Sequence, residues 1–467
     1  MSEKIFFSDP TNEMLVVEFV WENENLPLQN LPASFTGKKL ETILLPDKKI
    51  MVIGLGKKEE FNEDYYRRAA GKAVKAASYY KIDSVYFDLK DITERNCLLL
   101  FEGASLANYA FDKYKSEETK FFRIKKIVFP KNAENFKDAL NTSALVCGNA
   151  KFVRDLVNEN SNIVNPDFLE KTAEKIAKDN KLKISVLKKK ELEKLGMNCI
   201  LEVGKASTTS PRLIILEYYG NKSSKDKVLF VGKGICFDSG GLDIKPRESM
   251  LEMRSDMAGA ATVMALLKTA AEIKIKKNIV GIMAVTENLV DANSYRPKDI
   301  IKSYSGKTIE NLDTDAEGRL ILADALNYGV KNFNPNLVLE FSTLTGSVVG
   351  TFGQHCAGMF ANSQANDFKT KLFESGLNTY ERVWELPLFE EYIDETIGER
   401  SDFRSLGKTR YNGAIFGGAF LSQFVEKKPF IHLDIAGTAF IDEAKDYLPK
   451  DATGFGVRLI IDFLKKI

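Results

Sequence analysis

Residues 311–320 read Asn-Leu-Asp-Thr-Asp-Ala-Glu-Gly-Arg-Leu, which places three acids at alternate positions before a glycine and an arginine. Alternate side chains of an extended segment point the same way, so we expect Asp313, Asp315 and Glu317 to converge. Carboxylates converge only when something positive neutralises them, and hard divalent cations take oxygen ligands. An apolar run with helical spacing follows from Leu320, so the acids precede a helix. Taken alone, the motif also fits a solvated acidic turn with a capping carboxylate.

Gly318 and Arg319 complete the motif. We expect Gly318 to let backbone N–H groups approach a ligand closely. An arginine at the start of a helix favours a bound anion. The motif therefore predicts an anion position beside the carboxylates.

Composition sets broad limits on the protein class. The chain has 467 residues, 44% of them hydrophobic, and 66 basic against 65 acidic residues give a formal net charge of +1. This length predicts two or three domains. The balanced charge gives no reason to expect nucleic-acid or membrane binding, and no apolar run reaches the roughly 18 residues of a membrane span. Residues 1–4 show no signal-type pattern, so a cytoplasmic location is the default expectation.

Cysteine and histidine content narrows the chemistry. The five cysteines are scattered and form no Cys-x-x-Cys, which predicts free thiols rather than a disulfide frame or a zinc knuckle. Only two histidines occur, His355 and His432. Two histidines this far apart exclude a His-Glu-x-x-His motif and a site with three histidine ligands. They also leave few candidate bases for a Ser-His-Asp triad. The chemistry therefore rests on carboxylates, lysines and arginines.

The first part of the chain alternates strand-like and helix-like segments. Strands are predicted over 14–21, 49–55, 84–89 and 124–129, and helices over 62–80 and 94–114. This pattern predicts a smaller α/β domain over residues 1–135, without a catalytic constellation. The run Gly54-Leu55-Gly56-Lys57 completes neither phosphate-loop motif, so a turn is predicted there.

A helical pattern from Ala133 to about Val157, followed by a polar cluster up to Pro166, predicts a linker helix over 136–165. Residues 166–467 form the predicted second domain. Its helices are expected over 169–182, 188–196, 258–273, 320–330, 414–424 and 455–465, and its strands over 183–187, 213–218, 228–231, 279–285, 337–341 and 430–433. Continuous apolar strands alternating with helices predict an α/β/α catalytic domain with a mostly parallel central sheet.

Ligands of such sheets bind outside the carboxyl ends of the strands, so functional residues should follow strands. The strand at 228–231 is followed by a glycine-rich segment with Lys233, Asp238 and Lys245, and Asp256 precedes a helix of small residues. The strands at 279–285 and 337–341 are followed by Thr286-Glu287-Asn288 and Ser342-Thr343-Leu344-Thr345-Gly346. These loops and the 311–319 stretch belong to one set.

Segments 231–256 and 313–326 resemble the two signatures of the leucyl aminopeptidase family, the cytosolic two-metal aminopeptidases of peptidase family M17. The resemblance covers most of the chain, including stretches at 65–73, 102–104, 154–158, 295–297, 343–346 and 452–454. It is most specific at Thr314-Asp315-Ala316-Glu317-Gly318-Arg319-Leu320, Gly232-Lys233-Gly234 and Phe237-Asp238-Ser239-Gly240-Gly241.

The resemblance implies two divalent metal ions, manganese or zinc. Their ligands would be Lys233, Asp238, Asp256, Asp315 and Glu317. Four acids match the charge of two such ions, and flanking cations lower the pKa of a lysine ligand. A salt bridge is the alternative for Lys233, and a surface lysine before a proline turn is the alternative for Lys245.

The resemblance also implies the reaction: a metal-bridging water attacks the scissile carbonyl of a peptide with a free N-terminus. Asp256 and one metal would hold the α-amine, Lys245 would stabilise the oxyanion, and Arg319 would hold a bicarbonate that acts as general base. Leucine-like side chains are expected to be preferred, and the family forms homohexamers. The implied substrate-binding residues are Met253, Asp256, Thr343, Leu344, Gly346, Ala436 and Ala439.

The family usually has asparagine where this chain has Asp313. The extra carboxylate either shifts metal preference toward harder ions or accepts a backbone hydrogen bond. Two rival functions remain, a two-metal phosphoesterase and a non-catalytic aminopeptidase-like scaffold. A missing ligand or a missing Lys245 would mark the scaffold, and neither is seen.

Overall fold

The computed structural model describes residues 3–24, 32, 34–409 and 411–467; Met1 and Ser2, part of the N-terminal stretch without a signal pattern, lie outside them. The chain divides into two compact units, Met1–Lys151 with Asp442–Asp451 and Phe152–Ile441 with Ala452–Ile467. The division falls inside α3 (Lys137–Asn158), within the predicted linker. The predicted domain boundaries at 135 and 166 stay a prediction. In the described part of the chain, none of the helices has the length and hydropathy of a membrane span.

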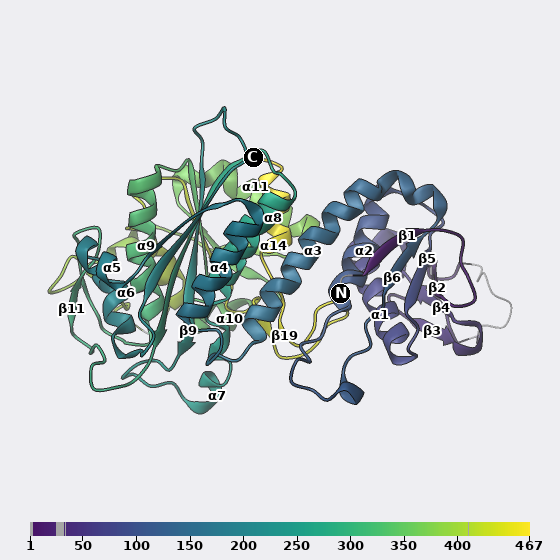
Figure 1. The fold of residues 1–467 in the computed structure, drawn as a ribbon, viewed down its shortest axis with the longest axis horizontal. Coiled ribbons are helices and arrows are strands. Elements are labelled where there is room, and N and C mark those ends of the chain that lie inside the picture. The colour runs from purple at the N-terminus through teal and green to yellow at the C-terminus, as the bar shows by residue number, and fades with distance from the viewer. Residues whose placement is uncertain (1–2, 25–31, 33, 410) are drawn as a thin grey trace. The chain divides into compact units, whose positions relative to one another are not determined.

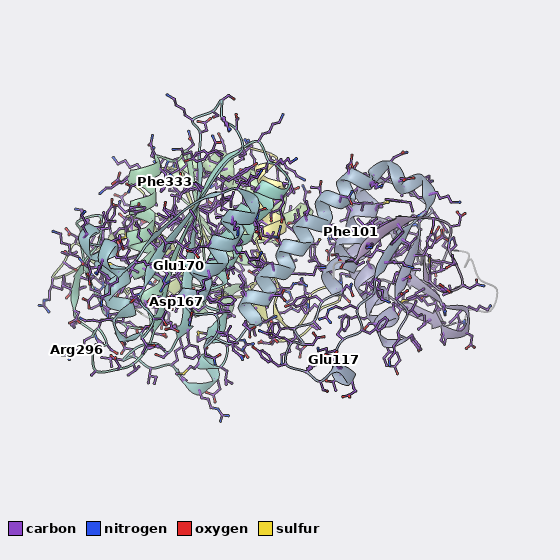
Figure 2. All side chains as sticks on the ribbon, in the orientation of Figure 1. Phe101, Glu117, Asp167, Glu170, Arg296 and Phe333 are labelled. Carbon is purple, nitrogen blue, oxygen red and sulfur yellow. The ribbon has the colours of Figure 1, made fainter. Side chains whose placement is uncertain are left out.

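The first unit contains a six-stranded sheet in the order β1-β6-β5-β2-β4-β3. Its strands are β1 (Lys4–Phe7), β2 (Leu15–Val20), β3 (Thr42–Leu45), β4 (Ile50–Gly54), β5 (Ser84–Asp88) and β6 (Lys126–Phe129), parallel except for the β3–β4 pair. Helices α1 (Asp64–Tyr79) and α2 (Glu94–Ala107) pack together, and Phe101 of α2 is fully buried (Figure 2). The turn predicted at Gly54-Leu55-Gly56-Lys57 is not found: Gly54 ends β4, and the amides of Leu55 and Gly56 donate to the carbonyls of Val20 and Gly37.

The second unit is built on an eight-stranded sheet in the order β15-β14-β17-β13-β9-β10-β8-β7. The strands are β7 (Lys183–Leu187), β8 (Arg212–Tyr219), β9 (Val228–Asp238), β10 (Asn278–Asn288), β13 (Leu337–Ser342), β14 (Ala357–Ala361), β15 (Val383–Glu385) and β17 (Phe430–Asp434). The central strands β17, β13, β9 and β10 are mutually parallel, whereas β7, β8 and β14 each pair antiparallel with a neighbour. The predicted α/β/α class with a mostly parallel sheet is confirmed.

Helices cover both faces of this sheet (Figure 1). One face carries α8 (Ala258–Glu272), with α4 (Pro166–Asn180) and α14 (Val457–Leu464) beside it. The other face carries α9 (Glu317–Phe333), with α6 (Asn198–Val203) and α13 (Gly413–Ser422). Leucine, isoleucine and valine side chains from β9, β10 and α9 form the core between them.

Further elements complete the unit. They are α5 (Lys189–Leu195), α7 (Arg247–Met250), β11 (Ile300–Lys302), β12 (Thr308–Glu310), α10 (Gly346–Phe352), α11 (Asn366–Thr379), α12 (Glu390–Asp394), β16 (Phe403–Arg404), β18 (Phe440–Ile441) and β19 (Asp451–Ala452), the last followed by the second unit's C-terminal segment. On one flank, Arg212 of β8 forms ion pairs with Asp167 (2.6 Å) and Glu170, both labelled on α4 in Figure 2. These pairs anchor α4 to the antiparallel side of the sheet.

Glycines bring α8 unusually close to the sheet. A Cβ atom at Gly232 would lie 2.6 Å from the carbonyl oxygen of Gly259, and one at Gly259 would lie 2.1 Å from that of Phe341. The prediction that the strand ends at Val231 is wrong, because β9 continues to Asp238 beside the equally long β10. Lys233 and Asp238 are therefore strand residues.

Leu229 tests the central packing. It is fully buried in the core between β9 and α9, where a Cβ atom at Gly329 would already lie 2.6 Å from its Cδ2. We expect Leu229→Ala to lower the free energy of unfolding by about 2–5 kcal/mol, since it leaves a cavity. The same substitution at Leu377, 55% exposed on α11, should cost at most about 0.5 kcal/mol. Equal losses for both variants in denaturant titrations would contradict this packing.

Asp324 of α9 gives the fold a pH dependence. It is fully buried, and burial raises its pKa from 3.8 to about 7 although the amides of Tyr304 and Ile200 donate to it. Between about pH 4 and 7 the folded state therefore holds a proton that the unfolded chain has lost, so the stability contributed by this group falls as pH rises. We expect Asp324→Asn to remove that slope. Urea titrations of both proteins across this window measure it, and parallel profiles would refute the assignment.

Candidate metal centre

Charged residues gather at the carboxyl edge of the central strands. Lys233 and Asp238 lie on β9, Asp256 precedes α8, and Asp315 and Glu317 stand at the start of α9. The expectation that functional residues follow the strands holds for Asp256, Asp315 and Glu317, whereas Lys233 and Asp238 lie within β9 itself.

Lys233 lies between two carboxylates. Its Nζ is 2.8 Å from both oxygens of Asp256 and 2.9 Å from Oε1 of Glu317, and it donates to the carbonyl of Thr343 at 3.1 Å. The side chain is 3% exposed. Burial opposes the charge, but the two carboxylates outweigh it and hold the pKa of Lys233 above its ordinary value. The ion pairs foreseen as the alternative for Lys233 are thus present, and binding to a metal requires loss of that proton.

Gly318 makes room for this lysine. A Cβ atom at Gly318 would lie 2.5 Å from Cε and 2.8 Å from Nζ of Lys233. The first turn of α9 therefore admits only glycine beneath the ammonium. The sequence suggested that this glycine lets backbone N–H groups approach a ligand. In the structure, it instead leaves room for the side chain of Lys233.

Lys245 bridges the other two acids. Its Nζ is 2.9 Å from Oδ2 of Asp238 and 2.5 Å from Oδ1 of Asp315. The loop that carries Lys245 is closed by its own amide, which donates to the carbonyl of Ser239 at 2.9 Å. Burial lowers the pKa of Lys245, but the neighbouring carboxylates, led by Asp238, raise it above its ordinary value overall. Lys245 is thus a fixed positive charge rather than a surface lysine.

Three carboxylates converge, but they are not the three expected. Oxygens of Asp238, Asp315 and Glu317 lie within 4.8 Å of one another. Asp313 does not join them, since its Oδ1 accepts the backbone N–H of Asp315 at 2.8 Å. The expected convergence is therefore wrong for Asp313, whose side chain makes the backbone hydrogen bond that was the alternative. An asparagine oxygen can accept the same bond.

The donor set fits divalent cations. Four carboxylates face two ammonium groups, so negative charge is in excess. Burial and mutual repulsion raise the pKa of Asp256 to about 8 and that of Asp315 to about 7, and they also raise the pKa of Glu317. Within the described part of the chain, the buried Oε2 of Glu317 has no hydrogen-bond partner. Crowded, under-paired carboxylate oxygens are suitable ligands for hard divalent ions.

A buried polar network that the sequence left without a role holds these segments together. Nδ2 of Asn288 donates to Oδ1 of Asp238 (2.8 Å) and to the carbonyl of Thr314 (3.0 Å), which also accepts from the Tyr295 hydroxyl (2.7 Å). The Thr314 amide donates to Oδ2 of Asp243 at 2.7 Å. The sequence could have pointed to Asn288 only through its position, because it is the last residue of β10.

Arg319 lies on the first turn of α9 and is 5% exposed. Its Nη1 donates to the carbonyl of Ser405 at 2.9 Å, and its guanidinium stacks on Phe416 at 5.4 Å. Among the described residues, its buried Nε has no hydrogen-bond partner. The side chain therefore keeps a donor for an anion.

The predicted substrate residues are placed unevenly around this centre. Thr343 joins it directly, since its hydroxyl donates to Oδ1 of Asp256 at 2.6 Å. Met253 lies in the short turn before Asp256, and Gly346 is exposed at the start of α10. Leu344 and Ala436 both donate their amides to one buried carboxylate, that of Asp434, whereas Ala439 is only 4% exposed. Their contact with substrate stays a prediction.

Comparisons with known proteins agree with each other. The family model "Cytosol aminopeptidase family, catalytic domain" matches residues 151–461, and "Cytosol aminopeptidase family, N-terminal domain" matches residues 33–118. A "Probable cytosol aminopeptidase" of Geobacter sp. (strain M21) is 39% identical over 92% of this chain and 90% of its own length. One of Aquifex aeolicus (strain VF5) is 37% identical, covering 97% and 95%. The solved structure "Bottromycin maturation enzyme BotP in complex with Mn" superposes with a TM-score of 0.87, 25% identity, and coverage of 98% and 99%.

Gly318→Ala tests the arrangement around Lys233. The added methyl group displaces the lysine, so we expect Mn²⁺ to bind about 10- to 100-fold more weakly, as when groups that orient metal ligands are lost. Isothermal titration calorimetry measures the dissociation constant. Gly148→Ala is the control, because a Cβ atom there meets nothing within 4 Å. Unchanged Mn²⁺ affinity in the Gly318 variant would show that Lys233 is not part of the centre.

Proposed function

This chain belongs to the cytosol aminopeptidase family and is a metal-dependent aminopeptidase, and we propose that it preferentially releases leucine-like N-terminal residues from peptides. One observation carries the proposed metal-dependent activity: two segments distant in sequence bring Asp238 together with Asp315 and Glu317, with Lys245 beside them. That arrangement supplies both ligands for divalent ions and a fixed positive charge for an oxyanion.

We propose that two divalent ions, manganese or zinc, are held by Lys233, Asp238, Asp256, Asp315 and Glu317. The excess of negative charge and the raised pKa values of Asp256, Asp315 and Glu317 support this set. When bound, the ions supply Lewis-acid chemistry, which acidifies water and polarises a carbonyl. The structurally similar enzyme BotP was solved in complex with Mn, which supports manganese as one candidate.

The side chains then divide the remaining tasks. The Asp256 carboxylate lies deep in the site, where it binds the α-ammonium of a peptide and so requires a free N-terminus. Asp238 and Asp315 hold the Lys245 ammonium in place before substrate arrives. A preorganised cation stabilises the oxyanion of the tetrahedral intermediate more than it stabilises the neutral carbonyl, and this difference lowers the barrier.

Proton transfer needs a base, and His432, one of the two histidines, is fully buried within β17. We propose that Arg319 binds a bicarbonate, supported by its unpaired Nε among the described residues. A bound bicarbonate supplies a general base close to the carboxylates. The start of α9 favours such an anion through its free backbone N–H groups.

The leucine preference rests on the predicted pocket residues Met253, Thr343, Leu344, Gly346, Ala436 and Ala439. A methionine in the wall adapts to several unbranched and branched side chains. We also propose a homohexamer and a cytoplasmic location. The family resemblance supports the assembly, and the names of the relatives support the location.

Hydrolysis of leucine p-nitroanilide tests the activity. We expect turnover by the Mn²⁺-loaded protein and its loss after EDTA treatment. Lys245→Ala should lower kcat about 10²- to 10³-fold, as when one oxyanion donor is removed. Asp315→Ala should abolish activity by weakening metal binding. Lys222→Ala removes an exposed lysine elsewhere and should retain full activity.

Two results would overturn this function. Equal rates for the parent, Lys245→Ala and Asp315→Ala proteins would place the active site elsewhere. Metal-dependent cleavage of p-nitrophenyl phosphate without release from leucine p-nitroanilide would instead favour a two-metal phosphoesterase.

A further inference from the structure

Apart from Met253, the predicted pocket residues lie on two loops that follow neighbouring parallel strands. The first loop, 343–346, follows β13, and the second, 435–439, follows β17. The two strands are in register up to the pair Ser342 and Asp434. Both loops therefore leave the sheet side by side, at the edge where the carboxylates converge.

One carboxylate joins the two loops. Asp434, the last residue of β17, is fully buried. Its Oδ1 accepts the amides of Leu344 (3.1 Å) and Ala436 (3.2 Å), and its Oδ2 accepts the hydroxyl of Thr345 (2.7 Å). Two of these three bonds go to the first loop and one goes to the second. The carboxylate thus spans both pocket walls.

This junction also reaches the helix behind the first loop. The Thr345 side chain caps α10, since its Oγ1 accepts the amide of Val348 at 3.2 Å. Two residues earlier, the hydroxyl of Thr343 donates to Asp256 and its carbonyl accepts from Lys233. The 343–345 segment is therefore fixed to the charged centre at one end and to Asp434 at the other.

Burying the Asp434 carboxylate costs free energy unless its hydrogen bonds compensate for the lost hydration. A buried carboxylate loses its hydration, and only charge-assisted hydrogen bonds compensate for that loss. Its three donors belong to loop residues and a loop side chain, and none is a rung between paired strands. The adjacent strand positions hold a second buried polar set, in which Glu340 accepts from Ser342 and pairs with His432. That set lies within the sheet, whereas Asp434 directs its oxygens to the loops.

We propose that Asp434 and Thr345 form a clamp that fixes the separation of the two pocket loops and so positions the pocket for leucine-sized side chains. The clamp rests on the proposed leucine-like preference of the site. Asp434 acts as a positioning residue, since its contacts are with loop residues. Loosening the clamp widens the range of pocket shapes, so a large side chain loses contacts that a small one never makes.

Thr345→Val tests the clamp, because valine keeps the shape of threonine and removes only the hydroxyl. We expect the ratio of kcat/KM for leucine p-nitroanilide to that for alanine p-nitroanilide to fall roughly ten-fold, mainly through a higher KM for leucine. Mn²⁺ affinity should stay within about two-fold, since no metal ligand is altered. A general loss of stability would not change the selectivity ratio in this way.

Three further variants serve as controls or as a second test of the clamp. Thr345→Ser retains the hydroxyl and should keep the parent ratio. Thr269→Val removes another buried hydroxyl, which donates to the Ala265 carbonyl on α8, and should also keep it. Asp434→Asn keeps the shape but has one acceptor oxygen fewer, so it should lower the ratio and stands in if Thr345→Val does not fold. Calorimetric binding of free leucine and free alanine gives a readout independent of turnover.

The outcomes separate the clamp from the proposed function. If the parent prefers leucine and both Thr345→Val and Asp434→Asn keep that preference in turnover and in binding, the clamp is refuted and the function stands. If the parent neither prefers nor binds leucine, the proposed preference fails and the clamp fails with it.

Discussion

The buried ammonium of Lys233 between Asp256 and Glu317 is the interaction on which the site depends. Four carboxylates cannot stay together in a buried site without positive charge nearby. Lys233 supplies that charge from within a strand, and its side chain reaches the acids only because Gly318 leaves the first turn of α9 open. The glycine at position 318, the Lys233 ammonium and the clustered carboxylates therefore depend on one another. Bound divalent ions would compensate the negative charge of the carboxylates in the same way.

The sheet explains how distant segments meet that constraint. Strands β17, β13, β9 and β10 run parallel, so the segments after them emerge at one edge. The glycine contact between β9 and α8 brings the start of that helix, preceded by Asp256, close to Lys233. Asn288 then links the end of β10 to the 314–317 segment through Asp238 and Thr314. Strand direction and close packing therefore bring the site residues together, although no single sequence motif contains all of them.

Much of this was visible in the sequence, for identifiable reasons. Apolar periodicity located the central strands of both sheets and the helices that cover the second, but it missed β1, β3, β15 and α11; the 314–320 motif located the acids. What failed depended on tertiary contacts. The glycines at 232 and 234 argued against a strand, yet β9 runs through them, and the small-residue strand β14 (Ala-Gly-Met-Phe-Ala) carries no β-branched signal. Likewise, alternation alone could not show that Asp313 turns back to its own backbone. The sequence also gave no sign that the Asp434 carboxylate joins two loops.

The carboxylates of this protein differ in the kind of group that compensates their charge, and that difference separates two kinds of role. Asp434 accepts three hydrogen bonds, and Asp324 accepts amides from two separate segments, so each is matched by fixed dipoles and holds backbone in place. Asp315 and Glu317 instead repel each other and Asp238, and they rely on the two lysines for compensation. A carboxylate that is satisfied by backbone and hydroxyl donors has no reason to bind a cation, whereas a crowded and under-paired group does. The neighbours of each acid, which are neutral dipoles for Asp434 and other carboxylates with a lysine for Asp315 and Glu317, therefore distinguish the residues that shape the pocket from those suited to a metal.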